Sequence, residues 1–221
     1  MNSIGAFGKL PALAEFISWR LPTEFTVPWH AWLVRGMADA RNRIGPVFED
    51  AFAMAPVWRF ALPAGAAGSA AVRGVLMPST DAAGRLFPLC LALCSKAGAS
   101  TPAASWFNCA EALARRVLEP DFRLDAWQDA LAGFGADPAD WQPDRGIPWS
   151  GWVAVRAGPE PDGGITNLAA AAVAEAAGVS CFWSEGSPFV APGAVLGPGL
   201  PEGLDFTRLL HDPASAGEVA E

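Results

Sequence analysis

A strand that is apolar on both of its faces limits the architectures open to this chain. Residues 86–94 are almost entirely apolar, and in a strand alternate residues point to opposite faces of the sheet. One face would carry Phe87, Leu89, Leu91 and Leu93, and the other Pro88, Cys90, Ala92 and Cys94. Because both faces need cover, this segment favours helices on each side of a sheet over an antiparallel sheet with one solvated face.

A second apolar segment, residues 71–77, precedes it, and the loop between the two reads Pro-Ser-Thr-Asp-Ala-Ala-Gly-Arg. This spacing suits an antiparallel pair of strands with a long turn. In the loop, Asp81 can accept hydrogen bonds from backbone N–H groups, Gly84 can adopt a positive φ, and Arg85 offers a planar set of donors to a carboxylate or phosphate. Two interpretations stay open: a structural corner capped by Asp81, or a partner-binding site formed by Ser79, Asp81 and Arg85.

The rest of the chain predicts helices and strands in mixed order. An amphipathic helix is expected from Pro28, in its first turn, to residue 44, and another begins with Asp125 as N-cap and Gln128 as capping-box partner. Further helices are expected at 46–54, 106–118 and 168–177, and strands near the N-terminus and at 57–62, 71–77, 86–93 and 179–183. Residues 137–149 are expected to be irregular. The fold class is therefore α/β, a mixed β-sheet flanked by helices on both faces, with one domain over residues 1–213 and a flexible tail at 214–221.

Composition and charge exclude several classes of function. The chain has 221 residues, 52% hydrophobic content and a formal charge of −8, which disfavours nucleic acid and anionic lipid and makes a basic partner more natural. No basic leader with a long apolar segment opens the sequence, so a secretory signal is not expected. The longest apolar run is about half the roughly 20 residues that span a bilayer. A cytoplasmic protein without direct membrane insertion is expected.

Motifs for catalysis and for metals are missing from the sequence. The four cysteines form no Cys-x-x-Cys pair and are expected to be buried and reduced, and the histidines, His30 and His211, suit a helix surface or end, so neither zinc nor any cofactor is expected. There is no Gly-x-Ser-x-Gly elbow, no Walker A sequence and no His-Glu-x-x-His pair. Most of the ten tryptophans fit core packing, while Trp141 and Trp149 stay open as a platform for sugar or peptide. We therefore expect a protein that is not an enzyme.

Several motifs, in order along the chain, resemble the TagF family (also called ImpM) of type VI secretion-associated proteins. They are Gly-x-Phe-Gly-Lys-Leu-Pro at 5–11, Phe-x-x-x-Arg-Leu-Pro at 16–22, Pro-Trp-x-x-Trp-Leu at 28–33, Ala-Pro-Val-Trp-Arg-Phe at 55–60, the loop motif at 78–89, and Gly-Leu-Pro at 199–201 before Phe206 and Leu209. His30 replaces an acid that is common in the family, and Ala14-Glu15-Phe16 stands where Gly-Asp-Phe is frequent.

The resemblance implies a three-layer α/β sandwich and a cytoplasmic accessory protein of the type VI secretion system. It implies a post-translational repressor of assembly that acts on a forkhead-associated scaffold protein. Some family members carry an additional phosphatase domain, and for this chain we expect any such activity to come from another polypeptide. Two alternatives stay open: a hydrolase or phosphoryl-handling enzyme that uses Ser79, Asp81 and Arg85, and a structural subunit of the secretion machine.

Overall fold

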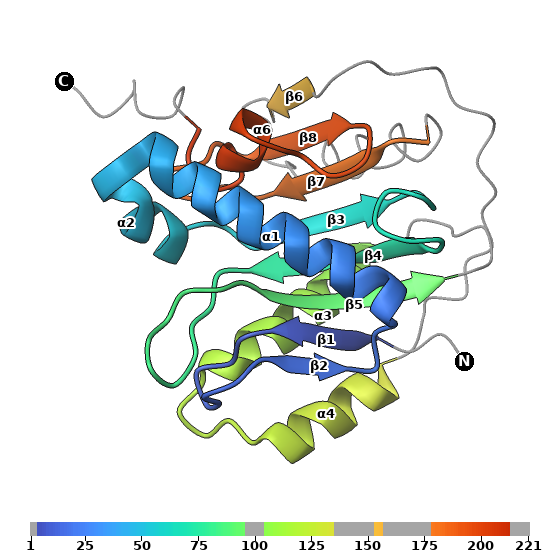
Figure 1. Cartoon of the computed structure of the whole chain (residues 1–221). Helices are drawn as coiled ribbons and strands as arrows, with labels where there is room; N and C mark the ends of the chain where they lie inside the picture. The colour runs from blue at the N-terminus through green and yellow to red at the C-terminus, as the bar shows by residue number, and fades with distance from the viewer. Residues whose placement is uncertain (1–3, 96–103, 135–152, 157–177, 213–221) are drawn as a thin grey trace.

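The computed structural model describes residues 4–95, 104–134, 153–156 and 178–212, and these build one eight-stranded sheet (Figure 1). The spatial order of the strands is β2-β1-β5-β4-β3-β7-β8-β6. Their bounds are β1 (Gly5–Gly8), β2 (Ile17–Trp19), β3 (Trp58–Leu62), β4 (Ala71–Met77), β5 (Leu89–Ser95), β6 (Val153–Arg156), β7 (Ser180–Ser184) and β8 (Gly193–Gly197). Every neighbouring pair is antiparallel, so the prediction of a mixed sheet is wrong for these strands.

The predicted central hairpin is present as β4 and β5, which pair from Ala71 opposite Ser95 to Met77 opposite Leu89. The second strand begins at Leu89, three residues later than the apolar run. Pro88, just before it, has no N–H group to donate to the strand ladder. The connecting loop is narrowed by a single bridge between Thr80 and Leu86.

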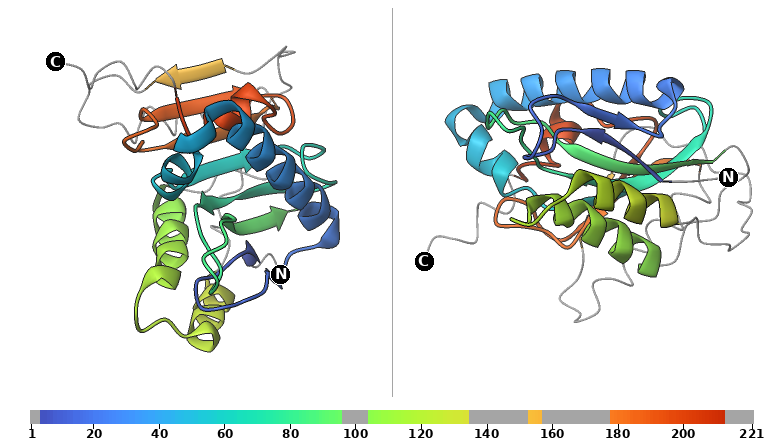
Figure 2. Two further views of the ribbon diagram at one scale, coloured as in Figure 1. Left: turned by 60° about the vertical axis from the view of Figure 1, so that its left-hand side comes forward. Right: turned by 90° about the horizontal axis from the view of Figure 1, so that it is seen from below.

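The two faces of β5 are covered by different helices, as the sequence predicts. Leu89, Leu91 and Leu93 belong to one buried cluster with Phe107 of α3 (Ala104–Arg115) and Trp127 of α4 (Leu124–Gly133). Cys90 and Ala92 belong to the other, with the tryptophans of α1 (Thr23–Ile44) and with α2 (Phe48–Ala53). Phe87, predicted on the same face as Leu89, lies in this second cluster instead, because it precedes the strand. Figure 2 shows α1 and α2 on one side of the sheet and α3 and α4 on the other.

The helix α1 begins at Thr23, five residues before the predicted start, so Pro28 lies inside it. Phe25 and Trp29 are buried in the same cluster, with ring centroids 5.1 Å apart. Packing of this first turn outweighs the loss of the one backbone hydrogen bond that a proline cannot donate. The prediction that Pro28 lies in the first turn is therefore wrong.

The helix α4 also begins earlier than predicted, at Leu124 with Arg123 in the N-cap position. Asp125 lies in the first turn, where it accepts a 2.9 Å hydrogen bond from the N–H of Ala126 and pairs with Arg123 at 3.0 Å. The assignment of Asp125 as N-cap is wrong by two residues. The carboxylate still lies near the positive end of the helix, where negative charge is favourable.

Two indole N–H groups, one on α1 and one on β3, donate hydrogen bonds to backbone carbonyls of the segment 201–209. Trp32 donates a 2.6 Å hydrogen bond to the carbonyl of Pro201, and Trp58 donates a 2.7 Å bond to that of Leu209. Between these two acceptors lies α6 (Leu204–Thr207), a short helix that contacts α1. The predicted helix at 168–177, the irregular stretch at 137–149, the tail at 214–221, Trp141 and Trp149 lie outside the described residues.

The described cysteines are free, but they do not share one environment. Cys90 and Cys181 are buried and Cys94 is half-buried, whereas Cys109 is exposed on α3, which corrects the prediction that all four are buried. Burial raises the pKa of the Cys94 thiol to about 11. Within the described ranges, no helix is both long and apolar enough to span a bilayer.

Candidate functional site

The predicted site loop folds around the carboxylate of Asp81, which is fully buried. Its Oδ2 atom lies 2.9 Å from Nζ of Lys9 and 2.7 Å from Nε of Arg85. Its Oδ1 atom accepts hydrogen bonds of 3.0 Å from the backbone N–H groups of Ala83 and Arg85. These four contacts occupy both oxygens of the carboxylate.

The backbone of the loop reaches this arrangement through Gly84, whose φ is +76°. Its N–H donates to the carbonyl of Asp81 at 2.9 Å, and the N–H of Asp81 donates to the carbonyl of Arg85 at 3.2 Å. A Cβ atom placed on Gly84 would meet nothing within 4 Å. The glycine is therefore required by backbone conformation and not by lack of space.

Ser79 and Arg85, the other two predicted site residues, join the same network. The hydroxyl of Ser79 is buried and donates a 2.9 Å hydrogen bond to the carbonyl of Lys9. Arg85 donates from Nη2 to the carbonyl of Ala14 at 3.0 Å, while 66% of its side chain stays exposed. The structure thus brings all three predicted residues together, but only Arg85 presents a substantial surface to solvent.

Lys9 completes this network, and sequence reasoning missed its role. It lies in the Gly-x-Phe-Gly-Lys-Leu-Pro motif at 5–11, which by itself does not indicate that its lysine pairs with Asp81. Its ammonium group also lies 3.3 Å from the carbonyl of Arg85 and 5.3 Å from the centre of the Phe16 ring. Phe16 in turn packs with Phe87 and with the exposed His30.

The charges of the network explain the state of Asp81. Burial by itself raises the pKa of this carboxyl group, but the hydrogen bonds from Lys9, Arg85 and Ala83 outweigh it and hold the pKa well below its ordinary value. Asp81 is therefore ionised at neutral pH. Two cationic side chains and one carboxylate leave one net positive charge at this corner.

A recess of about 280 Å³ opens beside the loop, where β3 begins and β4 ends. The end of α2 forms one wall through Phe52 and Ala53, and the end of α3 with the short 3₁₀ helix η2 (Arg116–Leu118) forms another through Arg115 and Leu118. Its lining is completed by Ala55, Pro56, Val57, Met77, Pro78, Ser79, Thr80 and Leu86. The recess therefore lies between helices that belong to opposite faces of the sheet.

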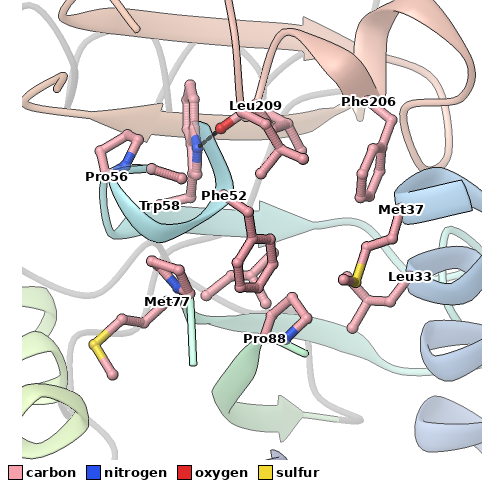
Figure 3. A pocket seen from close by; sticks show the side chains of 13 residues that line it. Leu33, Met37, Phe52, Pro56, Trp58, Met77, Pro88, Phe206 and Leu209 are labelled. Atoms are coloured by element: carbon pink, nitrogen blue, oxygen red, sulfur yellow. Dashed lines mark hydrogen bonds between the residues drawn. The ribbon is translucent and has the colours of Figure 1, made fainter. Parts of the chain in front are cut away.

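A smaller, apolar cavity of about 20 Å³ adjoins the recess, and Figure 3 shows the side chains that line it. The two share five lining residues, which are Phe52, Ala55, Pro56, Met77 and Pro78. Phe206 and Leu209 line the smaller cavity, next to the hydrogen bond between Trp58 and Leu209. A cavity of this size holds one water at most, and apolar walls offer such a water no hydrogen bonds.

A carboxylate shared by two arginines supports the wall of the recess. Glu111 on α3 accepts hydrogen bonds at Oε1 from Nη2 and Nε of Arg115, at 2.9 and 3.1 Å. Its Oε2 atom accepts from Nη2 and Nε of Arg59 on β3, at 3.0 and 3.3 Å. This bridge fixes the end of α3 against the sheet. Among the described residues, no group of three or more His, Cys, Asp or Glu side chains has the geometry of a metal site.

Comparison with known proteins places the chain in a family. Residues 5–134 match the model of the TagF N-terminal domain, described as type VI secretion system-associated. The crystal structure of PA0076 from Pseudomonas aeruginosa PAO1 is similar, with a TM-score of 0.75 and 33% sequence identity, over 99% of this chain and 97% of that one. No significant match was found among curated proteins. The chain therefore belongs to the TagF family of type VI secretion-associated proteins.

Proposed function

We propose that this protein is a non-enzymatic, cytoplasmic regulator that represses assembly of the type VI secretion system by binding a forkhead-associated scaffold protein. Membership of the TagF family supports the link to type VI secretion. Helices on both faces of the sheet agree with the three-layer sandwich of that family. The proposal adds to these observations a mode of action, which is capture of a protein partner.

The hydrogen bonds that Ser79 and Asp81 make within the site loop favour binding over catalysis. Hydrolysis by Ser79 would need an accessible hydroxyl and a base that accepts its proton. The hydroxyl instead donates to the carbonyl of Lys9, and among the described residues its hydrogen-bond partners include no imidazole or carboxylate. Asp81 is equally occupied, because both of its oxygens accept hydrogen bonds within the loop.

Co-purification tests the binding function directly. The tagged protein, expressed in its native cell, is expected to retain the scaffold protein, and its overproduction is expected to lower killing of a competitor that depends on type VI secretion. Deletion of the gene should raise secretion. Secretion that neither deletion nor overproduction changes would contradict the proposal.

Two further measurements separate the alternatives. A hydrolase would release phosphate from phosphorylated peptides, and Ser79→Ala would abolish that release. A structural subunit would co-purify at fixed stoichiometry with membrane or sheath particles. We expect neither result, and we expect the protein in the soluble fraction.

Arg85 is the one residue of the predicted partner-binding set with the exposure needed for direct contact. Lys9 keeps its bond to Asp81 when Arg85 is replaced, so Arg85→Ala should leave the network partly intact. A folded Arg85→Ala protein that binds the scaffold less tightly would assign recognition to the loop. If the folded Arg85→Ala protein binds the scaffold with unchanged affinity, the role of the loop is structural only.

A further inference from the structure

We propose that the recess between the ends of α2 and α3 is the surface that binds the protein partner, and that it receives an apolar side chain of that partner with a carboxylate beside it. This inference rests on the proposed function, because it requires a protein partner. It also moves the binding surface from the polar groups of the loop to the hollow next to them.

The shape and rim of the recess support an apolar anchor. Most of the residues that line it are apolar, and its volume of about 280 Å³ is just below that of small-molecule pockets, which begin at about 300 Å³. At the rim, the side chain of Leu118 is 56% exposed, and Met54, which directly follows the lining residue Ala53, is 47% exposed. Large apolar side chains exposed around a hollow are characteristic of interaction sites.

The charge of the recess supports an acidic neighbour for that anchor. Arg115 is the one charged residue among those that line it, and its side chain is 57% exposed. Its only acidic partner within the described ranges, Glu111, is shared with Arg59, whose Nη1 atom also lies 3.9 Å from the carboxylate of Glu185. Glu111 therefore divides its charge between two guanidinium groups. The Nη1 atom of Arg115 has no hydrogen-bond partner in the described part of the chain. A carboxylate of the partner can accept from it in a charge-assisted hydrogen bond.

Among the described residues, the other large apolar side chains that are exposed line neither of the two cavities described above; they are Phe16, Val27, Val34, Val47 and Leu204. Val27 and Val34 lie on α1, and Leu204 lies on α6. Leu204, at 47% exposure, is therefore a matched control for Leu118.

The experiment measures the affinity of the full-length chain for the full-length forkhead-associated scaffold protein of the same secretion system by isothermal titration calorimetry. The variants are Leu118→Glu, which places a charge at the apolar rim, Ala53→Trp, which fills the recess from an exposed position, and Arg115→Gln. The controls are Leu204→Glu and Arg41→Gln. The side chain of Arg41 is exposed to a similar extent as that of Arg115, 54% against 57%. Thermal unfolding followed by circular dichroism confirms that each variant is folded.

We expect Leu118→Glu and Ala53→Trp to weaken binding about tenfold or more, as replacement at the centre of an interface does. Arg115→Gln should weaken binding less and reduce its dependence on salt, as the loss of a rim charge does. Both controls should bind as the unaltered protein does.

Three outcomes would overturn the proposals, and they differ from one another. Binding that is unchanged in both Leu118→Glu and Ala53→Trp overturns the recess and leaves the proposed function standing. Absence of any binding by the unaltered protein overturns the proposed function itself. A homodimer that Leu118→Glu dissociates, in a protein whose affinity for the scaffold is unchanged, shows that a second copy of the chain occupies the recess instead.

Discussion

The ammonium group of Lys9 lies 2.9 Å from the carboxylate of Asp81, and both side chains are withdrawn from solvent, with exposures of 9% and 0%. Lys9 directly follows β1, and Asp81 lies in the loop that follows β4. These two strands are not neighbours, because β5 lies between them. The ion pair therefore connects the segments that follow β1 and β4, two strands that are separated in the sheet by β5.

Asp81→Asn should destabilise the protein more than Arg85→Gln does. The amide can still accept backbone hydrogen bonds, but Lys9 would keep a buried charge without a counter-charge, which is strongly unfavourable. The side chain of Arg85 is largely exposed, so water can replace the hydrogen bonds that Arg85→Gln removes. Urea unfolding of the two variants measures the order. A double variant, Lys9→Met with Asp81→Asn, should lose less stability than the two single changes added together, and strict additivity would contradict the coupling.

Acid should weaken the fold through the same carboxylate. The pKa of Asp81 in the folded state lies below the ordinary value of 3.8, so below that pH the unfolded chain binds the proton first. The stabilising contribution is complete above about pH 4 to 5 and is lost as the pH falls further toward the pKa of the folded state. The free energy of unfolding of the unaltered protein should therefore fall more steeply from pH 5 to pH 3 than that of Asp81→Asn. Equal slopes would contradict the lowered pKa.

Gly84→Ala tests whether the loop depends on a positive φ. A methyl group would fit without contact, but an L-residue at a φ of +76° costs about 1–2 kcal/mol. Gly133, at the end of α4, offers a matched control, since its Cβ position is equally open and its φ lies outside the left-handed region. Gly133→Ala should be neutral or stabilising by up to about 1 kcal/mol. Chemical denaturation of both variants decides the matter, and equal effects would count against the conformational argument.

The parts of the fold that could be predicted are those encoded by local pattern. Residues 89–94 are apolar on both faces of the strand, and apolar side chains on each face must be buried. This pattern therefore predicts helices on both sides of the sheet. The strand β8 was not predicted, since its five residues are bounded by glycine at both ends, with proline beside each, and such residues are depleted in strands. The strand β2 has three residues, too few to establish a period.

The candidate site, like the fold, has one part that the local sequence could predict and another that it could not. Asp81 and Arg85 are four residues apart, so their pairing could be proposed from the loop alone. The contact of Asp81 with Lys9 depends on β1 and β4 flanking the same strand, which no local pattern contains. The recess is still less accessible to sequence reasoning, because Ala53, Thr80 and Leu118 come from three separate parts of the chain. Sites built by tertiary packing become visible only with the structure.

Gly36→Ala sets helix propensity against packing. Alanine in the interior of a helix is favoured over glycine by about 0.5–1 kcal/mol, so propensity alone predicts a more stable α1. In the fold, however, a Cβ atom on Gly36 would clash with the ring of Phe206 on α6, where the nearest ring carbon is 2.3 Å away. Overpacking of this kind costs about 1–3 kcal/mol, and we expect it to prevail.

A double-mutant cycle identifies the cause of that loss. Phe206→Leu alone should destabilise the protein, because it removes ring contacts with Trp32, whose centroid lies 5.2 Å away. In the Gly36→Ala background the same change should cost less, or restore stability, because the smaller side chain makes room for the new methyl group. Urea unfolding of the four proteins gives the coupling energy. A stabilised Gly36→Ala protein, or two changes whose effects simply add, would show that Gly36 is not required by the close approach of Phe206.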